Sequence, residues 1–224
     1  MKTRTKIKLA IAVVLVALIG VYTAVFVPFG PTVGEKIDDY DNPHTALLLM
    51  DMQVDLVDKD GRLPVDQGQV PAMLAATNGL LARAQERGVE PIYVINTFSK
   101  WDVIGNLFRN QAVIAGSKGA RLDPRLKVVS KALFAKDMPD AFTNLEFDEH
   151  LRKRQINHIV MAGVFADQCV RATAIGALNR GYKVTVLKEA VAAASTEDRD
   201  QAYRDLEEDG ATVISVDQFI SQSK

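Results

Sequence analysis

Short apolar runs alternate with longer segments of helical spacing along most of the chain, and this alternation limits its fold more than any other feature. The apolar runs predict buried strands at residues 46–50, 91–96, 132–135, 158–163, 183–187 and 212–216. The segments between them predict helices at residues 70–87, 147–155, 170–180 and 196–209, the last with Thr196 as its N-cap. Strands that alternate with helices are joined by right-handed crossovers and pair in parallel. We therefore expect an α/β domain whose mostly parallel six-stranded sheet is covered on both faces.

Charge and cysteine content exclude several classes of protein. The 27 Lys and Arg residues nearly balance the 28 Asp and Glu residues, but four of the basic residues precede residue 9. The remainder is slightly acidic, which disfavours binding to a nucleic-acid backbone. Cys169 is the only cysteine, so an intrachain disulfide and a multi-thiolate metal site are both excluded. Glycine-rich nucleotide-binding motifs are missing as well.

The N-terminal segment predicts a membrane anchor. Residues 9–29 carry no charge and, as a helix, would span roughly 30 Å, the thickness of a bilayer core. Residues 1–8 form a basic flank that the positive-inside rule places in the cytoplasm, with the catalytic body on the extracytoplasmic side. A cleaved signal peptide is the alternative. We expect residues 30–44 to be a linker and residues 45–224 to form one domain.

Three chemically capable side chains follow predicted strands, where parallel sheets bind ligands. Asp51 follows the first strand, Lys136 the third, and Cys169 lies just past the fourth. Each residue alone is typical of a structural role. Together, a helix N-terminus and Lys136 would lower the pKa of Cys169, and Asp51 would accept its proton. The pattern predicts nucleophilic catalysis by a thiol.

Three motifs carry a specific resemblance to a family. TALLLMDMQVDL contains Asp51, Gln53 and Asp55; KDMPDAF begins at Lys136; and AGVFADQCVRATAIGALNRGY contains Cys169. In this order they resemble the isochorismatase-like cysteine hydrolases, over roughly residues 45–215. The resemblance implies a three-layer α/β/α, Rossmann-like domain with a catalytic triad of Asp51, Lys136 and Cys169.

The same resemblance implies how an oxyanion would be bound. It places a cis peptide between Val164 and Phe165, and it aims the backbone N–H groups of Phe165 and Cys169 at one point. One position departs from the family pattern, because Asp140 replaces the family's serine. Asp140 would add negative charge near the entrance of the site, and a plain surface position is the alternative.

Metal ligands of the kind found in some family members are missing from this sequence. Nicotinamidases of the family bind a divalent metal through D-x-H and a second histidine after the second strand, and neither is present here. The three histidines of the chain are interpreted as surface or hydrogen-bonded residues; they are His44, His150 and His158. We expect no metal and no cofactor.

Aromatic residues offer walls for a substrate pocket. Phe98 and Trp101 follow the second predicted strand, and Phe142 follows the third. They would enclose a small planar amide, as apolar pocket walls commonly do, although packing in the core is the alternative for each.

The resulting hypothesis is a membrane-anchored hydrolase that cleaves a C–N bond of a small amide, ureido or carbamoyl compound through a Cys169 thioester. Two alternatives stay open: a vinyl-ether hydrolase, which would need no cysteine nucleophile, and a catalytically idle binding domain. The family resemblance also implies that the domain associates with copies of itself.

Overall fold

The computed structural model describes residues 30–222. The predicted anchor at residues 9–29 and its basic flank at residues 1–8 lie outside this part of the chain. Within residues 30–222, no helix combines the length and the apolar character needed to cross a bilayer.

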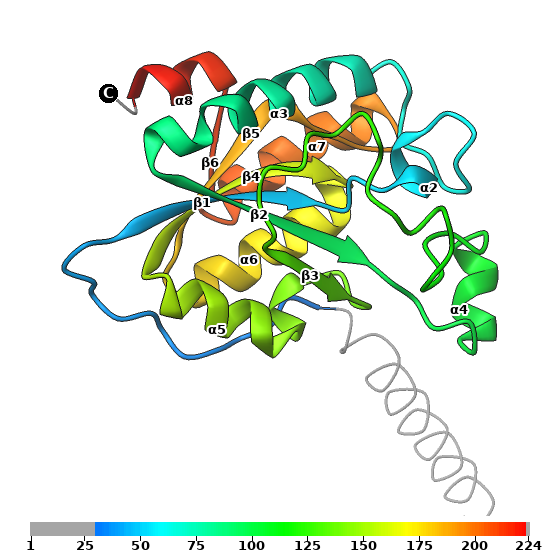
Figure 1. Ribbon diagram of the computed structural model, residues 1–224, viewed down its shortest axis with the longest axis horizontal. Helices are drawn as coiled ribbons and strands as arrows, with labels where there is room; N and C mark the ends of the chain where they lie inside the picture. Colours follow the sequence, from blue (N-terminus) through cyan, green and yellow to red (C-terminus); the bar gives the residue numbers. More distant parts are fainter. Residues whose placement is uncertain (1–29, 223–224) are drawn as a thin grey trace, which may run out of the picture. The chain divides into compact units, whose positions relative to one another are not determined.

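Six strands form one sheet, in the order β3-β2-β1-β4-β5-β6 (Figure 1). All five pairings of neighbouring strands are parallel, as the alternation of strands and helices predicts. The strands are β1 (His44–Met50), β2 (Val89–Asn96), β3 (Leu133–Lys136), β4 (Ile156–Val164), β5 (Lys183–Ala192) and β6 (Thr212–Ile214). The chain moves outward from β1 to β3 and then returns to the other side of β1 with β4. This reversal creates a switch point between β1 and β4, where ligands bind in such sheets.

Helices cover both faces of the sheet, which confirms the expected three layers. The helices are α2 (Val54–Val57), α3 (Val70–Ala84), α4 (Val103–Phe108), α5 (Leu145–Lys153), α6 (Arg171–Asn179), α7 (Thr196–Glu208) and α8 (Val216–Gln222). Helices α5, α6 and α7 contribute to one hydrophobic core, whereas α3 and α8 contribute to the other. Strand β1 supplies Leu48 and Met50 to the first core, and Leu47 and Leu49 to the second. Burial on both faces explains why its sequence is apolar without interruption.

Some boundaries differ from the sequence predictions. Ser195, not Thr196, caps α7, because its hydroxyl accepts a hydrogen bond from the amide of Asp198 at 3.0 Å. Strand β6 stops at Ile214, since α8 begins at Val216. Helices α2, α4 and α8 were not predicted, because each is too short to show helical periodicity in the sequence.

Residues 31–43, which the sequence assigns to a linker, contain no helix or strand and are held against the domain; we call them the N-terminal strap. The amide and the hydroxyl of Thr32 both donate to Asp140 Oδ2, each at 2.7 Å. The Thr32 carbonyl accepts from Asn179 Nδ2 at 2.9 Å, and the amide of Ile37 donates to the Arg180 carbonyl at 2.8 Å. These contacts fix the start of the strap to residues that follow β3 and α6.

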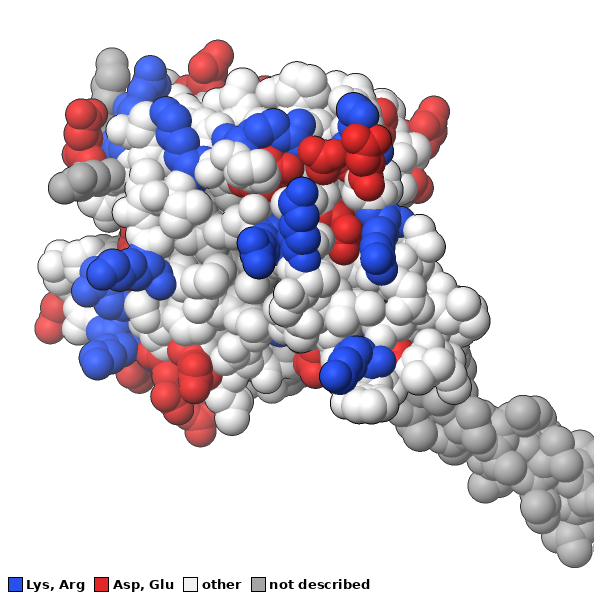
Figure 2. Space-filling model, turned by 45° about the vertical axis from the view of Figure 1, so that its right-hand side comes forward, with Lys and Arg blue, Asp and Glu red and all other residues white. Residues whose placement is uncertain are grey.

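Basic and acidic side chains are interspersed over the upper part of the surface that Figure 2 shows. This mixture agrees with a nearly balanced composition of 27 basic and 28 acidic residues. Lower on the same face, charged clusters are separated by uncharged surface (Figure 2).

Candidate active site

Asp51 stands where β1 ends, and its backbone has a positive φ of 53°. Its amide donates to the Val94 carbonyl at 2.8 Å, which ties it to β2. On the other side, Gly163 of β4 approaches so closely that a Cβ atom there would lie 2.0 Å from the Met50 carbonyl oxygen. A glycine is therefore required opposite the end of β1. The switch point of the sheet thus fixes the position of Asp51.

The structure brings the predicted Asp51, Lys136 and Cys169 together. Lys136 Nζ lies 2.9 Å from Asp51 Oδ2, and both of these side chains are completely buried. Cys169 is also buried, with 8% of its surface exposed. The other Asp51 oxygen, Oδ1, is buried and has no hydrogen-bond partner among the described residues. Cys169 lies close enough to act on the pKa of Asp51 through a side-chain hydrogen bond, so the carboxylate is within the reach that proton transfer requires.

Asn96, the last residue of β2, joins the three side chains, and the sequence analysis missed it. Its Oδ1 accepts from Lys136 Nζ at 2.8 Å, and its Nδ2 donates to Asp51 Oδ2 at 2.9 Å. The same Nδ2 lies 3.6 Å from Cys169 Sγ, so the side-chain amide of Asn96 contacts all three residues. The signal for Asn96 was a polar residue at the end of the apolar run PIYVIN.

The other two residues of the D-x-Q-x-D motif support this arrangement. Gln53 Nε2 donates to the Asn96 carbonyl at 2.7 Å, and Gln53 Oε1 accepts from the Asn96 amide at 2.8 Å. Asp55 Oδ2 accepts from the Val113 amide at 2.8 Å. Gln53 therefore clamps the backbone of Asn96, whereas Asp55 holds the loop that follows α4.

Burial sets the protonation of the cluster. It raises the pKa of the Asp51 carboxyl, and the attraction of Lys136 offsets only part of that rise. Burial on its own would lower the pKa of Lys136, but the attraction of Asp51 and Cys169 leaves it above its ordinary value. The Lys136 ammonium is therefore retained at neutral pH.

The pKa of the Cys169 thiol differs from the sequence prediction. Lys136 acts on Cys169 in the predicted direction, toward a lower pKa, but burial has the larger effect and raises the pKa of Cys169 to about 11. The prediction of a thiolate is therefore corrected: without a ligand, Cys169 is a neutral thiol at pH 7.

One feature of the backbone before Cys169 was predicted. The Val164–Phe165 peptide is cis, which confirms that expectation. Cys169 lies in a π-type turn, Ala166–Val170, that precedes α6. The Phe165 carbonyl accepts from the amides of Gln168 and Val170, the residues on either side of Cys169. The turn therefore widens at the cysteine.

The four predicted substrate contacts lie in different surroundings. Phe142 is 2% exposed and packs edge-on against Phe147 in the core, so the structure favours the alternative of core packing for this residue. Trp101 is 80% exposed and encloses nothing. Phe98 is half-buried, and the Arg109 guanidinium lies 3.7 Å from its ring centroid.

Asp140 is completely buried, so the alternative of a surface position is wrong. Its Oδ1 accepts from the Phe142 amide at 2.9 Å, and its Oδ2 accepts from Thr32. Both oxygens of Asp140 therefore accept hydrogen bonds from the protein. The expectation that Asp140 adds a free negative charge at the entrance of the site is wrong. Its role is to fasten the strap, and Gly176 leaves room for its carboxylate.

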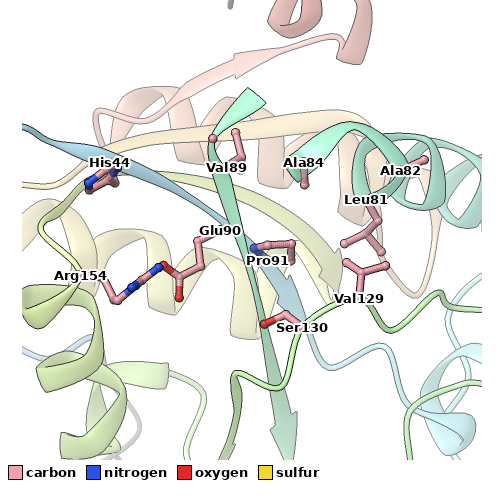
Figure 3. A pocket seen from close by; sticks show the side chains of 11 residues that line it. His44, Leu81, Ala82, Ala84, Val89, Glu90, Pro91, Val129, Ser130 and Arg154 are labelled. Atoms are coloured by element: carbon pink, nitrogen blue, oxygen red, sulfur yellow. The ribbon is translucent and has the colours of Figure 1, made fainter. Parts of the chain in front are cut away.

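Two hollows lie at opposite edges of the sheet. A hollow of about 260 Å³ adjoins Lys136 and is lined by Thr97, Asp137, Thr143 and Asn144 among others. A larger one, of about 660 Å³, lies at the amino-terminal edge of the sheet near His44 and Glu90, far from the cysteine (Figure 3). Size therefore does not identify the site here.

The residues present do not fit the divalent metal site of nicotinamidases. His44 begins β1, at the opposite edge of the sheet from Cys169. His150 Nε2 contacts Glu90 Oε1 at 2.9 Å, and His158 Nε2 contacts Thr185 Oγ1 at 2.9 Å. Within residues 30–222, no three His, Cys, Asp or Glu side chains converge as metal ligands would.

Comparisons with known proteins point to one family. The model of the isochorismatase domain matches residues 45–218. The nicotinamidase of Escherichia coli is 26% identical over 208 aligned positions, which cover 78% of this chain and 96% of the relative. An Arabidopsis thaliana relative named "Probable inactive nicotinamidase" is 29% identical over 167 positions, covering 69% and 83%. The crystal structure of the Streptococcus mutans pyrazinamidase/nicotinamidase superimposes with a TM-score of 0.67 at 29% identity, covering 76% of this chain and 99% of that one.

Proposed function

We propose, because this chain belongs to the isochorismatase family, that it is a cysteine hydrolase cleaving the C–N bond of a small amide, ureido or carbamoyl compound. The observation that carries the proposal is the buried cluster in which Asp51 and Lys136 form an ion pair, Asn96 contacts both of them and Cys169, and Cys169 acts on the pKa of Asp51. The relatives named for nicotinamide and pyrazinamide support an amide as the substrate class.

In the first half of the reaction, the Cys169 thiol gives its proton to Asp51 Oδ1, and its sulfur attacks the substrate carbonyl carbon. The C–N bond breaks as Asp51 returns the proton to the departing nitrogen, which leaves as ammonia or an amine. The carbonyl oxygen becomes negative in between, and the amides of Phe165 and Cys169 stabilise it. The product of this half is a thioester on Cys169.

In the second half, Asp51 takes a proton from water, whose oxygen attacks the thioester carbonyl. The C–S bond breaks, the proton goes to the sulfur, and the carboxylic acid leaves. Lys136 keeps its positive charge throughout and stabilises the two groups that become anionic in turn. Asn96 is a positioning residue, since it holds Lys136 and Asp51 in register.

A substrate panel tests this proposal against its alternatives. The full chain is assayed for ammonia release from primary amides and carbamoyl compounds, and for cleavage of a vinyl ether, with and without EDTA. We expect release from an amide or a carbamoyl compound at a rate that EDTA does not change. Turnover confined to the vinyl ether would favour the second activity, and no turnover on any member would favour an idle domain like the Arabidopsis relative's name describes.

We also propose that residues 9–29 anchor the protein in a membrane, with the domain on the extracytoplasmic side. The support is the uncharged apolar segment and its basic flank. Protease added to spheroplasts should then digest the domain, while fractionation finds the undigested chain with membranes. Protection from protease, or a soluble mature chain that begins near Val25, would contradict this.

A further inference from the structure

Helix α4 buries a polar side chain and exposes its apolar ones, which is the reverse of an ordinary surface helix. Its one fully buried side chain is polar: Asn106 is 1% exposed and its Nδ2 donates to the Ser99 carbonyl at 2.9 Å. Its large apolar side chains face solvent instead. A helix that packs on a core shows the opposite pattern, so α4 is built to present apolar groups outward.

Five large apolar side chains form this surface, which we call the α4 patch. They are exposed by 70% to 84% and belong to Trp101, Val103, Ile104, Leu107 and Phe108. Asp102 caps the helix by accepting from the Gly105 amide at 3.1 Å, and it forms an ion pair with Arg109. The patch is therefore held on an ordered helix. Figure 2 turns this side of the domain forward. Contiguous exposed apolar surface of this kind marks a contact site.

Helix α4 and the start of the strap are both held near β2 and β3, which are paired neighbours. Helix α4 follows the carboxyl end of β2, beyond the arrowheads of β2 and β3 in Figure 1. Thr32 is bonded to Asp140, four residues after the carboxyl end of β3, and also to Asn179 and Arg180 at the end of α6. The start of the strap therefore lies between the two edges of the sheet, and α4 projects from the carboxyl edge.

The chain before Thr32 limits how far the domain can lie from the predicted anchor. That anchor ends at Phe29, and the three residues to Thr32 span at most about 11 Å. Two hydrogen bonds hold Thr32 to a buried carboxylate of the domain. If residues 9–29 lie in a bilayer, this short connection keeps the domain near the bilayer surface.

We propose that the α4 patch inserts into the interface of the lipid bilayer and holds the hydrolase domain against it. Tryptophan, phenylalanine and leucine are the side chains that favour this depth, and Lys100, whose Nζ lies 5.2 Å from the Trp101 ring centroid, would meet the headgroups. The proposal goes beyond the hydrolase activity and rests on the proposed anchor. A second copy of the chain fits less well, because five side chains fall far short of the roughly 20 to 30 residues per side of a stable dimer.

The chain carries its own probe, because Trp101 is its only tryptophan. The full chain is reconstituted into vesicles of phosphatidylcholine and phosphatidylglycerol, with and without bromine on the acyl chains. We expect bromolipid to reduce the Trp101 emission at least about twofold and acrylamide to reach the indole poorly, as for a side chain at the interface. Replacing Ile104→Glu and Leu107→Glu together should abolish the bromolipid quenching while the chain still floats with vesicles. Both positions are exposed, so the fold has no need of them.

A matched control moves the indole to the other edge of the sheet. Combining Trp101→Phe with Val129→Trp places it in the hollow of Figure 3, where bromolipid should not quench it. Equal quenching at both positions, or none at Trp101 in chains that float, would overturn the proposal. Protection from acrylamide that grows with protein density but without bromolipid quenching would assign the patch to a second copy and overturn it too. Failure to float would overturn the anchor and this inference together, whereas ammonia release by the same sample tests the hydrolase function separately.

Discussion

The two edges of the sheet treat charged groups in opposite ways. At the carboxyl edge, Asp51 and Lys136 are completely buried, and one oxygen of Asp51 has no partner among the described residues. At the amino edge, Glu90 in the larger hollow has two partners. It contacts His150 at 2.9 Å, and it contacts Arg154, which lies beside it in Figure 3, at 2.6 Å. Arg154 is more than half exposed there. The difference teaches that an incompletely satisfied buried charge marks the site, whereas the larger volume does not.

The reason is energetic. Burying a charged pair costs several kcal/mol in desolvation, and its attraction need not repay that cost. A fold that only needed stability would lose little by replacing Asp51 and Lys136 with apolar residues. A partly solvated pair such as Glu90 and Arg154, whose arginine is 57% exposed, costs little and contributes little. Stability therefore does not explain the buried pair at the carboxyl edge, which agrees with the proposed chemistry.

The sharpest contrast comes from neutralising one carboxylate at each edge. Asp51→Asn keeps the shape but cannot accept a proton, so the rate of ammonia release should fall by about 10² or more. Glu90→Gln removes the same charge at the amino edge and should leave that rate unchanged. Steady-state kcat of both variants is the measurement, and an equal loss in both would erase the distinction between the edges.

The rate of Cys169 alkylation at different pH values measures how strongly burial raises the pKa of this thiol. Below a pKa of about 11, the thiolate fraction rises about tenfold for each pH unit, so the iodoacetamide rate should rise about a hundredfold from pH 7 to pH 9 and continue upward. Glutathione, used as a free-thiol control, should begin to level off near pH 9. Lys136→Met should slow the reaction further, because it removes the cation that lowers the pKa of Cys169. A Cys169 rate that levels off below pH 8 would show that the thiolate is favoured after all.

Two asparagines that make similar bridges separate positioning from stability. Asn96→Asp keeps the shape, but it replaces the donor to Asp51 with a negative charge, and kcat should fall about tenfold or more with the pH optimum moved upward. Asn78 bridges the Arg125 carbonyl at 2.9 Å and the Lys127 amide at 2.8 Å, away from the cluster. Asn78→Asp should lower the melting temperature without changing kcat or its pH profile. If Asn96→Asp changed only the melting temperature, its positioning role would be wrong.

The smallest expected effect is on stability, from His158 near the amino edge. Burial, with a further contribution from Lys183, lowers the pKa of His158 to about 4. An unfolded histidine binds a proton below pH 6.5 while the folded one stays neutral, so this contribution is complete above pH 6.5 and is lost as pH falls toward 4. Between pH 6.5 and pH 5 it should cost about 1.6 kcal/mol of unfolding free energy. Urea titrations of wild type and His158→Gln at both values measure it, and an identical pH dependence in the two would contradict the assignment.

The sheet and the three motif residues could be predicted because they depend on local sequence. Apolar runs such as ALLLM and HIVMAG require burial on both faces, and a polar residue after each run falls at the carboxyl edge. What could not be predicted depends on distances that the sequence does not carry. Asn96 looked like the end of a strand, and Phe142 and Asp140 looked accessible until the strap and the core were seen to enclose them.

The pKa of the Cys169 thiol could not be predicted from the sequence either. The sequence correctly places Lys136 near Cys169, and a nearby cation lowers a thiol pKa. The amount of burial decides the sign of the total shift, and burial appears only in the folded chain. Trp101, which lies just before α4, was predicted to be a pocket wall or core for a similar reason, since a six-residue helix has too few turns to show which side faces inward.

The most direct test of the central claim is the rate of ammonia release by Cys169→Ala, measured on the best amide of the panel. The account predicts a rate indistinguishable from the uncatalysed reaction, with a far-UV circular dichroism spectrum and a melting temperature close to those of the wild type, because the missing sulfur is the nucleophile and contributes little packing. Near-normal release of ammonia by a folded Cys169→Ala variant would contradict the proposed thioester and with it the role of the whole buried cluster.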